Sequence, residues 1–150
     1  MRRLADFLSR ERVLLLQTTV KKDALNALID AVARHVSDPE ALRKAIFERE
    51  RILSTGIGLG IAVPHAKITG LRQFVLAVGV SQQGIDYDSL DKKPVHIIVM
   101  IAGPEGAQQQ YLQILARTTL LLKNAANRKA ILAAKTEDDI YKLFAESSPG

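Results

Sequence analysis

Two spacings of hydrophobic residues alternate along the chain, and together they predict strands that alternate with helices. Short apolar runs bounded by polar or turn-forming residues indicate buried strands at residues 13–16, 74–80 and 95–101. Apolar residues at helical spacing indicate helices at residues 4–8, 22–36, 39–49, 107–122, 124–135 and 136–144. The run at 95–101 is the most apolar, so we expect this strand to be central, with both faces covered.

Capping and turn residues predict where several elements begin and end. The Ser37-Asp38-Pro39-Glu40 segment joins capping residues to a proline in the first turn, which predicts the start of the second long helix. Thr136 with three acids after it predicts the start of the last helix. Residues 81–84, ending in glycine, are expected to close the strand before them. His35, at a helix end, is interpreted as a surface residue rather than a ligand.

Strands separated by capped helices predict the α/β class. The simplest architecture is a single-domain three-layer sandwich, in which a small mixed β-sheet has helices on both faces. A length of 150 residues fits one domain spanning residues 1–150, in which residues 146–150 are expected to form a frayed tail.

Composition limits the classes of function. The absence of cysteine excludes disulfides, cysteine nucleophiles and thiolate metal sites. No apolar run approaches the roughly 20 residues of a membrane span, and residues 1–6 lack the apolar core of a signal peptide, so we expect a cytoplasmic protein without membrane insertion. The net charge of +5 is spread along the chain and only 5% of residues are aromatic, which makes a nucleic-acid partner improbable and leaves an acidic protein partner open.

The segment from Arg49 to His65 carries most of the candidate chemistry. Glycine there can adopt backbone angles closed to other residues, and its N–H groups can turn toward an anion. Pro64 fixes the approach to His65, whose neutral imidazole is a good nucleophile near pH 7, and the Arg49 guanidinium can bind phosphate oxygens. This combination favours phosphoryl transfer. The glycines alternate with apolar residues as Gly56, Ile57, Gly58, Leu59, Gly60 and Ile61.

Simpler interpretations of these residues also exist. On charge alone, residues 48–51 form a solvated helix end, and a lone Pro-His pair is more often structural than catalytic. The glycine spacing matches neither a Walker A loop nor the G-x-G-x-x-G fingerprint, so no nucleotide cofactor is expected. His35, His65 and His96 do not have metal-ligand spacing, so no metal is expected, and His96 is interpreted as a hydrogen-bonded structural residue.

The segment nevertheless resembles a known signature. Arg49-Glu50, then Ser54-Thr55-Gly56-Ile57-Gly58, then Gly60-Ile61-Ala62-Val63-Pro64-His65 is similar to the enzyme IIA domain of the fructose/mannitol type, in the bacterial phosphoenolpyruvate-dependent phosphotransferase system. The similarity extends over nearly the whole chain. A single short domain of this kind is similar to the nitrogen-regulatory branch, although free-standing sugar-specific domains also exist.

The resemblance implies roles for individual residues. His65 matches the phosphoryl acceptor, which takes the group from a histidine-containing phosphocarrier protein and, in sugar-specific members, passes it to an enzyme IIB. Arg49 matches the arginine beside that site. Ser54, Thr55 and the three glycines match the segment around the phosphohistidine. Such transfer requires positioning and hydrogen-bond donors for the phosphoryl oxygens, and no metal is obligatory.

One position departs from the family pattern. The family commonly has a second histidine followed by Leu-x-x-Leu, where this chain has Tyr111. Tyrosine can donate a hydrogen bond to a phosphate oxygen but cannot become a cation near neutral pH. Two functions therefore stay open. The chain is a working phosphocarrier, or it is a regulatory binding module that controls a partner protein, as in nitrogen- or potassium-type regulation, with weak or no phosphotransfer. A hydrophobic rim of Ile57, Leu59 and Ile61 would suit docking in either case.

Overall fold

Strand β6 (Val95–Pro104) lies in the middle of the sheet, as its apolar sequence predicts. The structure is a computed structural model that describes residues 3–146. Successive side chains of a strand point to opposite faces, and in β6 both sets are buried in separate hydrophobic clusters. One set packs under α1 (Lys21–Val32) and α2 (Pro39–Ile52), and the other packs against the helices of the second half of the chain. The first set is Ile98, Met100 and Ala102, and the second is Ile97, Val99 and Ile101.

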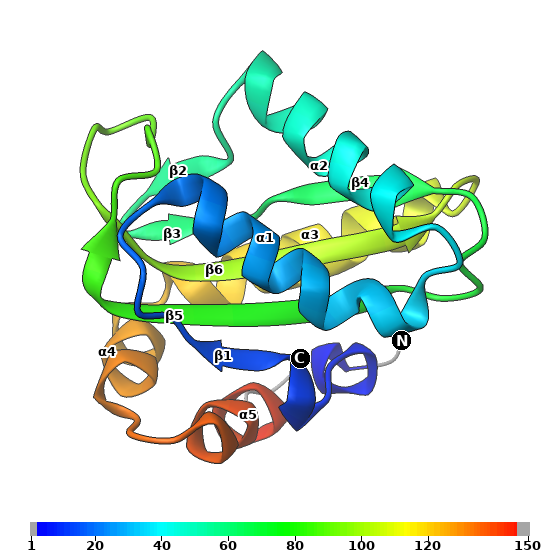
Figure 1. Ribbon diagram of the computed structural model, residues 1–150. Coiled ribbons are helices and arrows are strands. Elements are labelled where there is room, and N and C mark those ends of the chain that lie inside the picture. The colour runs from blue at the N-terminus through cyan, green and yellow to red at the C-terminus, as the bar shows by residue number, and fades with distance from the viewer. Residues whose placement is uncertain (1–2, 147–150) are drawn as a thin grey trace.

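Helices cover both faces of a mixed six-stranded sheet, which confirms the predicted α/β architecture (Figure 1). Before the sheet come two 3-10 helices, η1 (Leu4–Phe7) and η2 (Arg10–Arg12), and a third, η3 (Ala33–His35), follows α1. The strands are β1 (Val13–Leu15), β2 (Gly56–Gly58), β3 (Ile61–Ala62), β4 (His65–Ile68), β5 (Val75–Ile85) and β6. The helices are α1 (Lys21–Val32), α2 (Pro39–Ile52), α3 (Gln108–Lys123), α4 (Ala125–Ala133) and α5 (Glu137–Glu146).

The predicted helix starts are confirmed by their hydrogen bonds. Asp38 caps α2, since its Oδ1 accepts a hydrogen bond from the Ala41 N–H at 3.1 Å, and Pro39 is the first helical residue. Thr136 Oγ1 accepts from the Asp139 N–H at 3.1 Å at the start of α5. This last helix extends through Glu146, two residues beyond its predicted end; of the predicted frayed tail, residues 147–150 lie outside the described part of the chain.

Residues 81–84 do not end a strand, contrary to the sequence-based prediction. β5 continues to Ile85 through an irregularity, because Val80 pairs with Ile97 whereas Ile85 pairs with Val95. Gly84 adopts a left-handed φ of 94° there, and its N–H donates to Ser81 Oγ at 2.9 Å. The polar residues and the glycine that suggested a turn instead make a bulge.

The register beside β6 fixes the position of His65. Ile61 and Ala62 of β3 pair in parallel with Ile97 and Ile98, and His65 of β4 pairs with Ile101. The offset is the same on both sides of Pro64, so β3 and β4 form one line along β6. Pro64 cannot donate to the ladder, but its carbonyl accepts from the Ile101 N–H at 2.9 Å.

Among residues 3–146, no helix is both long enough and apolar enough to span a membrane.

Gly103 of β6 is tightly packed against Phe74, which in turn supports Tyr111. A Cβ at Gly103 would lie 2.6 Å from Phe74 Cδ2, and the Phe74 ring in turn stacks on Tyr111 with centroids 6.2 Å apart. Gly106, in contrast, has nothing within 4 Å of an added Cβ, although its φ is 84°.

We expect Gly103→Ala to lower the free energy of unfolding by roughly 2–3 kcal/mol, because a methyl group there must displace the buried Phe74 ring. Gly106→Ala, the matched control, should cost only about 1 kcal/mol from its left-handed backbone. Chemical denaturation of both variants measures the difference. An equal loss of unfolding free energy in the two variants would show that the Phe74 ring moves aside without cost.

Candidate functional site

His65 is the first residue of β4 and lies at its half-buried end. The alternation of the strand places Ala66 and Ile68 in the cluster under α1 and α2, so His65 projects to the other face of the sheet. The ring centroid of Tyr111, from α3, lies 5.5 Å from that of His65, with the planes tilted by 57°. The sequence-predicted pair of His65 and Tyr111 is therefore brought together.

The hydrogen bond of His65 determines which ring nitrogen can react. Its Nδ1 lies 2.8 Å from the carbonyl oxygen of Val63, two residues earlier in the chain. A carbonyl oxygen only accepts, so Nδ1 carries the proton, and in the neutral ring the lone pair lies on Nε2. The chain segment that contains Pro64 thus holds the imidazole with Nε2 as its nucleophilic atom.

The surroundings of His65 favour its neutral form. Burial is the main cause that lowers the pKa of His65 below its ordinary value, and the positive charges of Arg49 and Lys67 lower it further. The Val63 hydrogen bond and the negative charge of Glu50 act in the opposite direction. The net result is a ring that remains uncharged at neutral pH.

Arg49 lies in the last turn of α2, half-buried. Its Nη1 donates to the carbonyl oxygen of Leu53 at 2.6 Å, which holds the side chain at the helix end. A guanidinium has five N–H donors, so others are left for an anion. Its charge lowers the pKa of both His65 and Tyr111, although burial is the larger influence on each.

The glycines form a hairpin between β2 and β3. The turn passes through Gly58, Leu59 and Gly60, which have φ angles of 96°, 59° and 76°. The Gly56 N–H donates to Ser54 Oγ at 3.1 Å, so this N–H does not point to an anion as predicted. A Cβ at Gly56 would lie 2.9 Å from Ser89 Oγ. Close approach of the chain therefore requires this glycine.

Thr55 belongs to a buried polar network. Its hydroxyl makes a hydrogen bond to the Glu50 carboxylate and lies 3.0 Å from the Tyr87 hydroxyl, while its N–H donates to Glu50 Oε1 at 3.2 Å. Lys21 of α1 completes the network through an ion pair with Glu50 at 2.9 Å. Thr55 therefore anchors the hairpin, whereas Ser54, which is half-buried, lies at its edge.

Glu50 is a residue whose importance the sequence analysis missed. It was included in a solvated charged helix end, yet its side chain is only 5% exposed. Leu42, Ile46 and Glu50 are spaced four apart and are the buried residues of α2. This helical spacing was the signal that would have placed Glu50 on the buried face.

Tyr111 is buried against Phe74, and burial raises the pKa of Tyr111 to about 12. Its hydroxyl therefore stays protonated at neutral pH. A protonated hydroxyl can donate a hydrogen bond to an incoming oxygen atom. The tyrosine supplies a donor where a histidine would supply a donor and a charge.

The predicted hydrophobic rim is correct at two of its three positions. The residues Ile57 and Leu59 are 40% and 55% exposed, but Ile61 is fully buried in the core, because its strand pairs with β6. Two apolar residues that the prediction omitted, Ile52 and Leu53 at the end of α2, are 81% and 56% exposed.

The remaining two histidines have structural contacts. His96 Nδ1 lies 2.8 Å from the Ser81 carbonyl oxygen, which confirms its interpretation as a hydrogen-bonded structural residue. His35 is exposed as predicted, and its Nε2 lies 2.9 Å from Nη1 of the buried Arg12. Because a guanidinium only donates, His35 acts as the acceptor.

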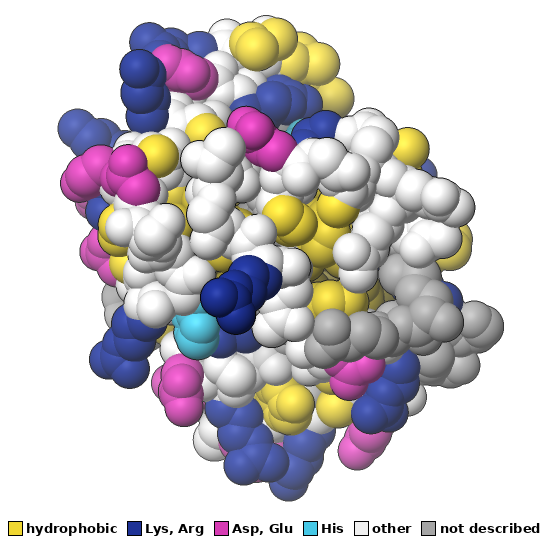
Figure 2. Space-filling view, turned by 90° about the vertical axis from the view of Figure 1, so that its right-hand side faces the viewer, with side chains coloured by type: hydrophobic (Ala, Val, Ile, Leu, Met, Phe, Trp, Pro, Cys, Tyr) yellow, Lys and Arg dark blue, Asp and Glu magenta, His cyan; other side chains and the backbone are white. Residues whose placement is uncertain are grey.

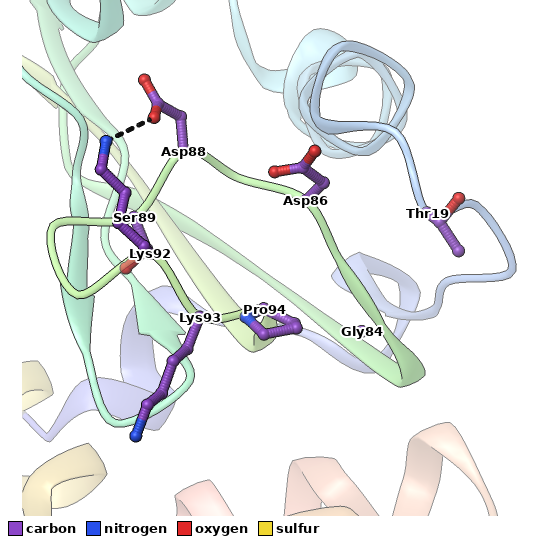
Figure 3. A pocket seen from close by; sticks show the side chains of 8 residues that line it. All are labelled: Thr19, Gly84, Asp86, Asp88, Ser89, Lys92, Lys93 and Pro94. Atoms are coloured by element: carbon purple, nitrogen blue, oxygen red, sulfur yellow. Dashed lines mark hydrogen bonds and ion pairs between the residues drawn. The ribbon is translucent and has the colours of Figure 1, made fainter.

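A hollow of about 480 Å³ adjoins the hairpin through Ser89, whose Oγ donates to the Gly56 carbonyl oxygen at 3.0 Å (Figure 3). It is lined by Thr19, Gly84, Asp86, Asp88, Ser89, Lys92, Lys93 and Pro94, none of which is a predicted site residue. The ion pair at 3.1 Å between Lys92 and Asp88 lies at the exposed surface. Within residues 3–146, no three His, Asp or Glu side chains are grouped so that they could hold a metal ion.

The basic excess of the chain is not gathered on the face drawn in Figure 2, where Lys and Arg side chains are interspersed with acidic and uncharged ones.

Sequence comparison connects this geometry to known proteins. The family model described as "Phosphoenolpyruvate-dependent sugar phosphotransferase system, EIIA 2" matches residues 6–147. The fructose-specific EIIABC component of Bacillus subtilis is 36% identical over 145 residues; the match covers 95% of this chain but only 23% of that longer protein. The nitrogen regulatory protein of Pseudomonas aeruginosa is 32% identical, over 87% of this chain and 86% of the relative.

Solved structures share the fold. The nitrogen regulatory protein IIA-Ntr of Neisseria meningitidis superposes with a TM-score of 0.88 at 22% identity, covering 94% of this chain and 98% of that one. Enzyme IIA mannitol of Escherichia coli, in its complex with phosphorylated enzyme IIB mannitol, gives a TM-score of 0.76 at 17% identity, covering 91% and 96%. The chain belongs to the EIIA 2 family of the phosphoenolpyruvate-dependent sugar phosphotransferase system.

Proposed function

We propose that the protein is a histidine phosphocarrier in which Nε2 of His65 accepts a phosphoryl group from a histidine-containing phosphocarrier protein. The observation that carries this proposal is the 2.8 Å contact between His65 Nδ1 and the Val63 carbonyl, which leaves the lone pair on Nε2. The lowered pKa of His65, caused mainly by burial, supports it because only the neutral ring is a nucleophile.

The transfer step needs no proton movement at His65. As the N–P bond of the donor phosphohistidine breaks, its electron pair returns to the donor ring, and the Nε2 lone pair forms the new N–P bond. The proton stays on Nδ1, which donates a hydrogen bond to the Val63 carbonyl oxygen throughout. The ring then carries a positive charge beside the doubly negative phosphoryl group, whose oxygens accept hydrogen bonds from Arg49 and the Tyr111 hydroxyl.

The next recipient is an enzyme IIB or a regulated protein. Enzyme IIA mannitol has the same fold as this chain, and its complex with phosphorylated enzyme IIB mannitol supports the first possibility. The 32% identity to a nitrogen regulatory protein over most of both chains supports the second, in which the phosphorylation state of His65 controls a partner. The exposed Ile52, Leu53, Ile57 and Leu59 provide apolar area for either partner.

We expect His65→Ala to abolish labelling by phosphoenolpyruvate, enzyme I and the phosphocarrier protein, because it removes the nucleophile. His35→Ala, which removes an exposed imidazole bonded to Arg12, should leave labelling intact. Intact-mass measurement of an acid-labile phosphoryl adduct, followed by peptide mapping, decides the matter. Persistent labelling of the His65→Ala protein would assign the acceptor role to another residue.

Arg49→Ala should slow phosphoryl acceptance about 100-fold, since one well-placed donor stabilises the transferring group by that order. Arg51→Ala is the matched control, because Arg51 lies in the same helical turn but is exposed. Rapid-quench measurement of the single-turnover rate compares the two. Similar single-turnover rates in both variants would show that Arg49 is only a solvated surface charge.

The rate of phosphoryl acceptance should stay constant as the pH falls through about 6.5, the ordinary pKa of an imidazole. Burial lowers the pKa of His65, so protonation removes the nucleophile only at a lower pH. The acid limb of the pH–rate profile, compared with an NMR titration of the His65 ring, measures this directly. A midpoint at or above 6.5 would contradict the expectation.

A further inference from the structure

Lys67 lies two residues after His65 in β4, on the same face of the strand. Alternate residues of a strand share a face about 7 Å apart. Since Ala66 and Ile68 are buried in the cluster under α1 and α2, His65 and Lys67 both project toward α3. The exposed lysine is thus placed beside the reactive ring by the strand itself.

Two contacts hold the Lys67 ammonium at this place. Its Nζ lies 4.9 Å from the centroid of the Tyr111 ring, the same ring that lies 5.5 Å from the His65 ring. Nζ also donates a hydrogen bond to Oε1 of Gln108, the first residue of α3. Cation–ring attraction and this hydrogen bond act together. The ammonium is therefore held beside Tyr111 before any ligand arrives.

The site has a deficit of positive charge that Lys67 can fill. Tyr111 is uncharged, and one donor of Arg49 is already bonded to the Leu53 carbonyl. Glu50 adds a negative charge near His65, although Lys21 pairs with it. A phosphoryl group on His65 brings about two negative charges more.

We propose that Lys67 is a second phosphate-binding cation of the site, in addition to Arg49, and that it binds the phosphoryl group on His65 from the side of α3. This inference rests on the proposed function of His65. The long, flexible lysine stem lets the ammonium leave Gln108 and follow the phosphoryl oxygens, and the exposed position keeps the path open. Lys67 thereby supplies at Tyr111 the charge that the tyrosine lacks.

The electrostatic surroundings agree with this placement. The charged and titratable groups that act on His65 are Arg49, Glu50 and Lys67, and Tyr111 lies against its ring. Burial is the first cause of the lowered pKa of His65, and Lys67 contributes in the same direction. Removal of the lysine charge should therefore raise the pKa of the imidazole.

The test compares Lys67→Gln with Lys67→Arg, which keeps the charge, and with Lys92→Gln, which removes an exposed lysine paired with Asp88. We expect Lys67→Gln to slow phosphoryl acceptance about 10-fold or more and to raise the His65 pKa in an NMR titration. Lys67→Arg and Lys92→Gln should leave both near the wild-type values. Equal rates and equal His65 titrations in the Lys67→Gln and wild-type proteins would overturn the proposal.

A second probe separates this proposal from that of the phosphocarrier. If the wild-type protein takes up no phosphoryl group, the proposed function fails. Binding of inorganic phosphate then tests whether Lys67 binds a phosphate group. Phosphate should shift the His65 NMR signals in the wild-type protein, and Lys67→Gln should weaken this binding about 10-fold. Phosphate binding that is unchanged in Lys67→Gln would overturn the role of the lysine.

Discussion

The pairing of one strand line with β6 is the constraint on which the site depends. β3 and β4 keep the same register along β6, although Pro64 interrupts them. A proline cannot donate to a ladder, yet its carbonyl still accepts from Ile101, so the chain departs from the sheet only briefly. In that interval the Val63 carbonyl turns to the His65 ring. A rigid sheet and a short departure from it together orient one imidazole.

The elements were largely predictable because local patterns determine them. The start of α2 depends only on the Asp38 carboxylate and the few residues after it, so it was predicted correctly. Residues 81–84 were not, because a strand bulge and a turn use the same residue types, and only the pairing with β6 distinguishes them. Ile61 was placed on the surface for a similar reason. Its burial comes from a strand far away in the sequence.

The site was predictable as a set of residues but not as a set of contacts. His65 and Tyr111 do meet, as the resemblance implied. The Thr55 hydroxyl, however, is hydrogen-bonded to the buried Glu50 carboxylate. The contacts of Glu50 and Lys67 can be seen only in the three-dimensional structure. Glu50 acts through the Thr55 hydroxyl and Lys21, and Lys67 through a ring on another element. Sequence spacing within one strand or helix cannot give such contacts between elements.

The Val63 carbonyl would also give the proposed reaction of His65 a regiochemistry. A free imidazole exchanges its proton between both nitrogens, so an electrophile in solution attacks either one. In this protein Nδ1 lies 2.8 Å from a backbone oxygen that accepts its proton in a hydrogen bond and that no side-chain substitution removes. Any electrophile that enters the site therefore meets one nucleophilic atom, and the isomer of the product is selected by the main chain rather than by the partner that delivers the group.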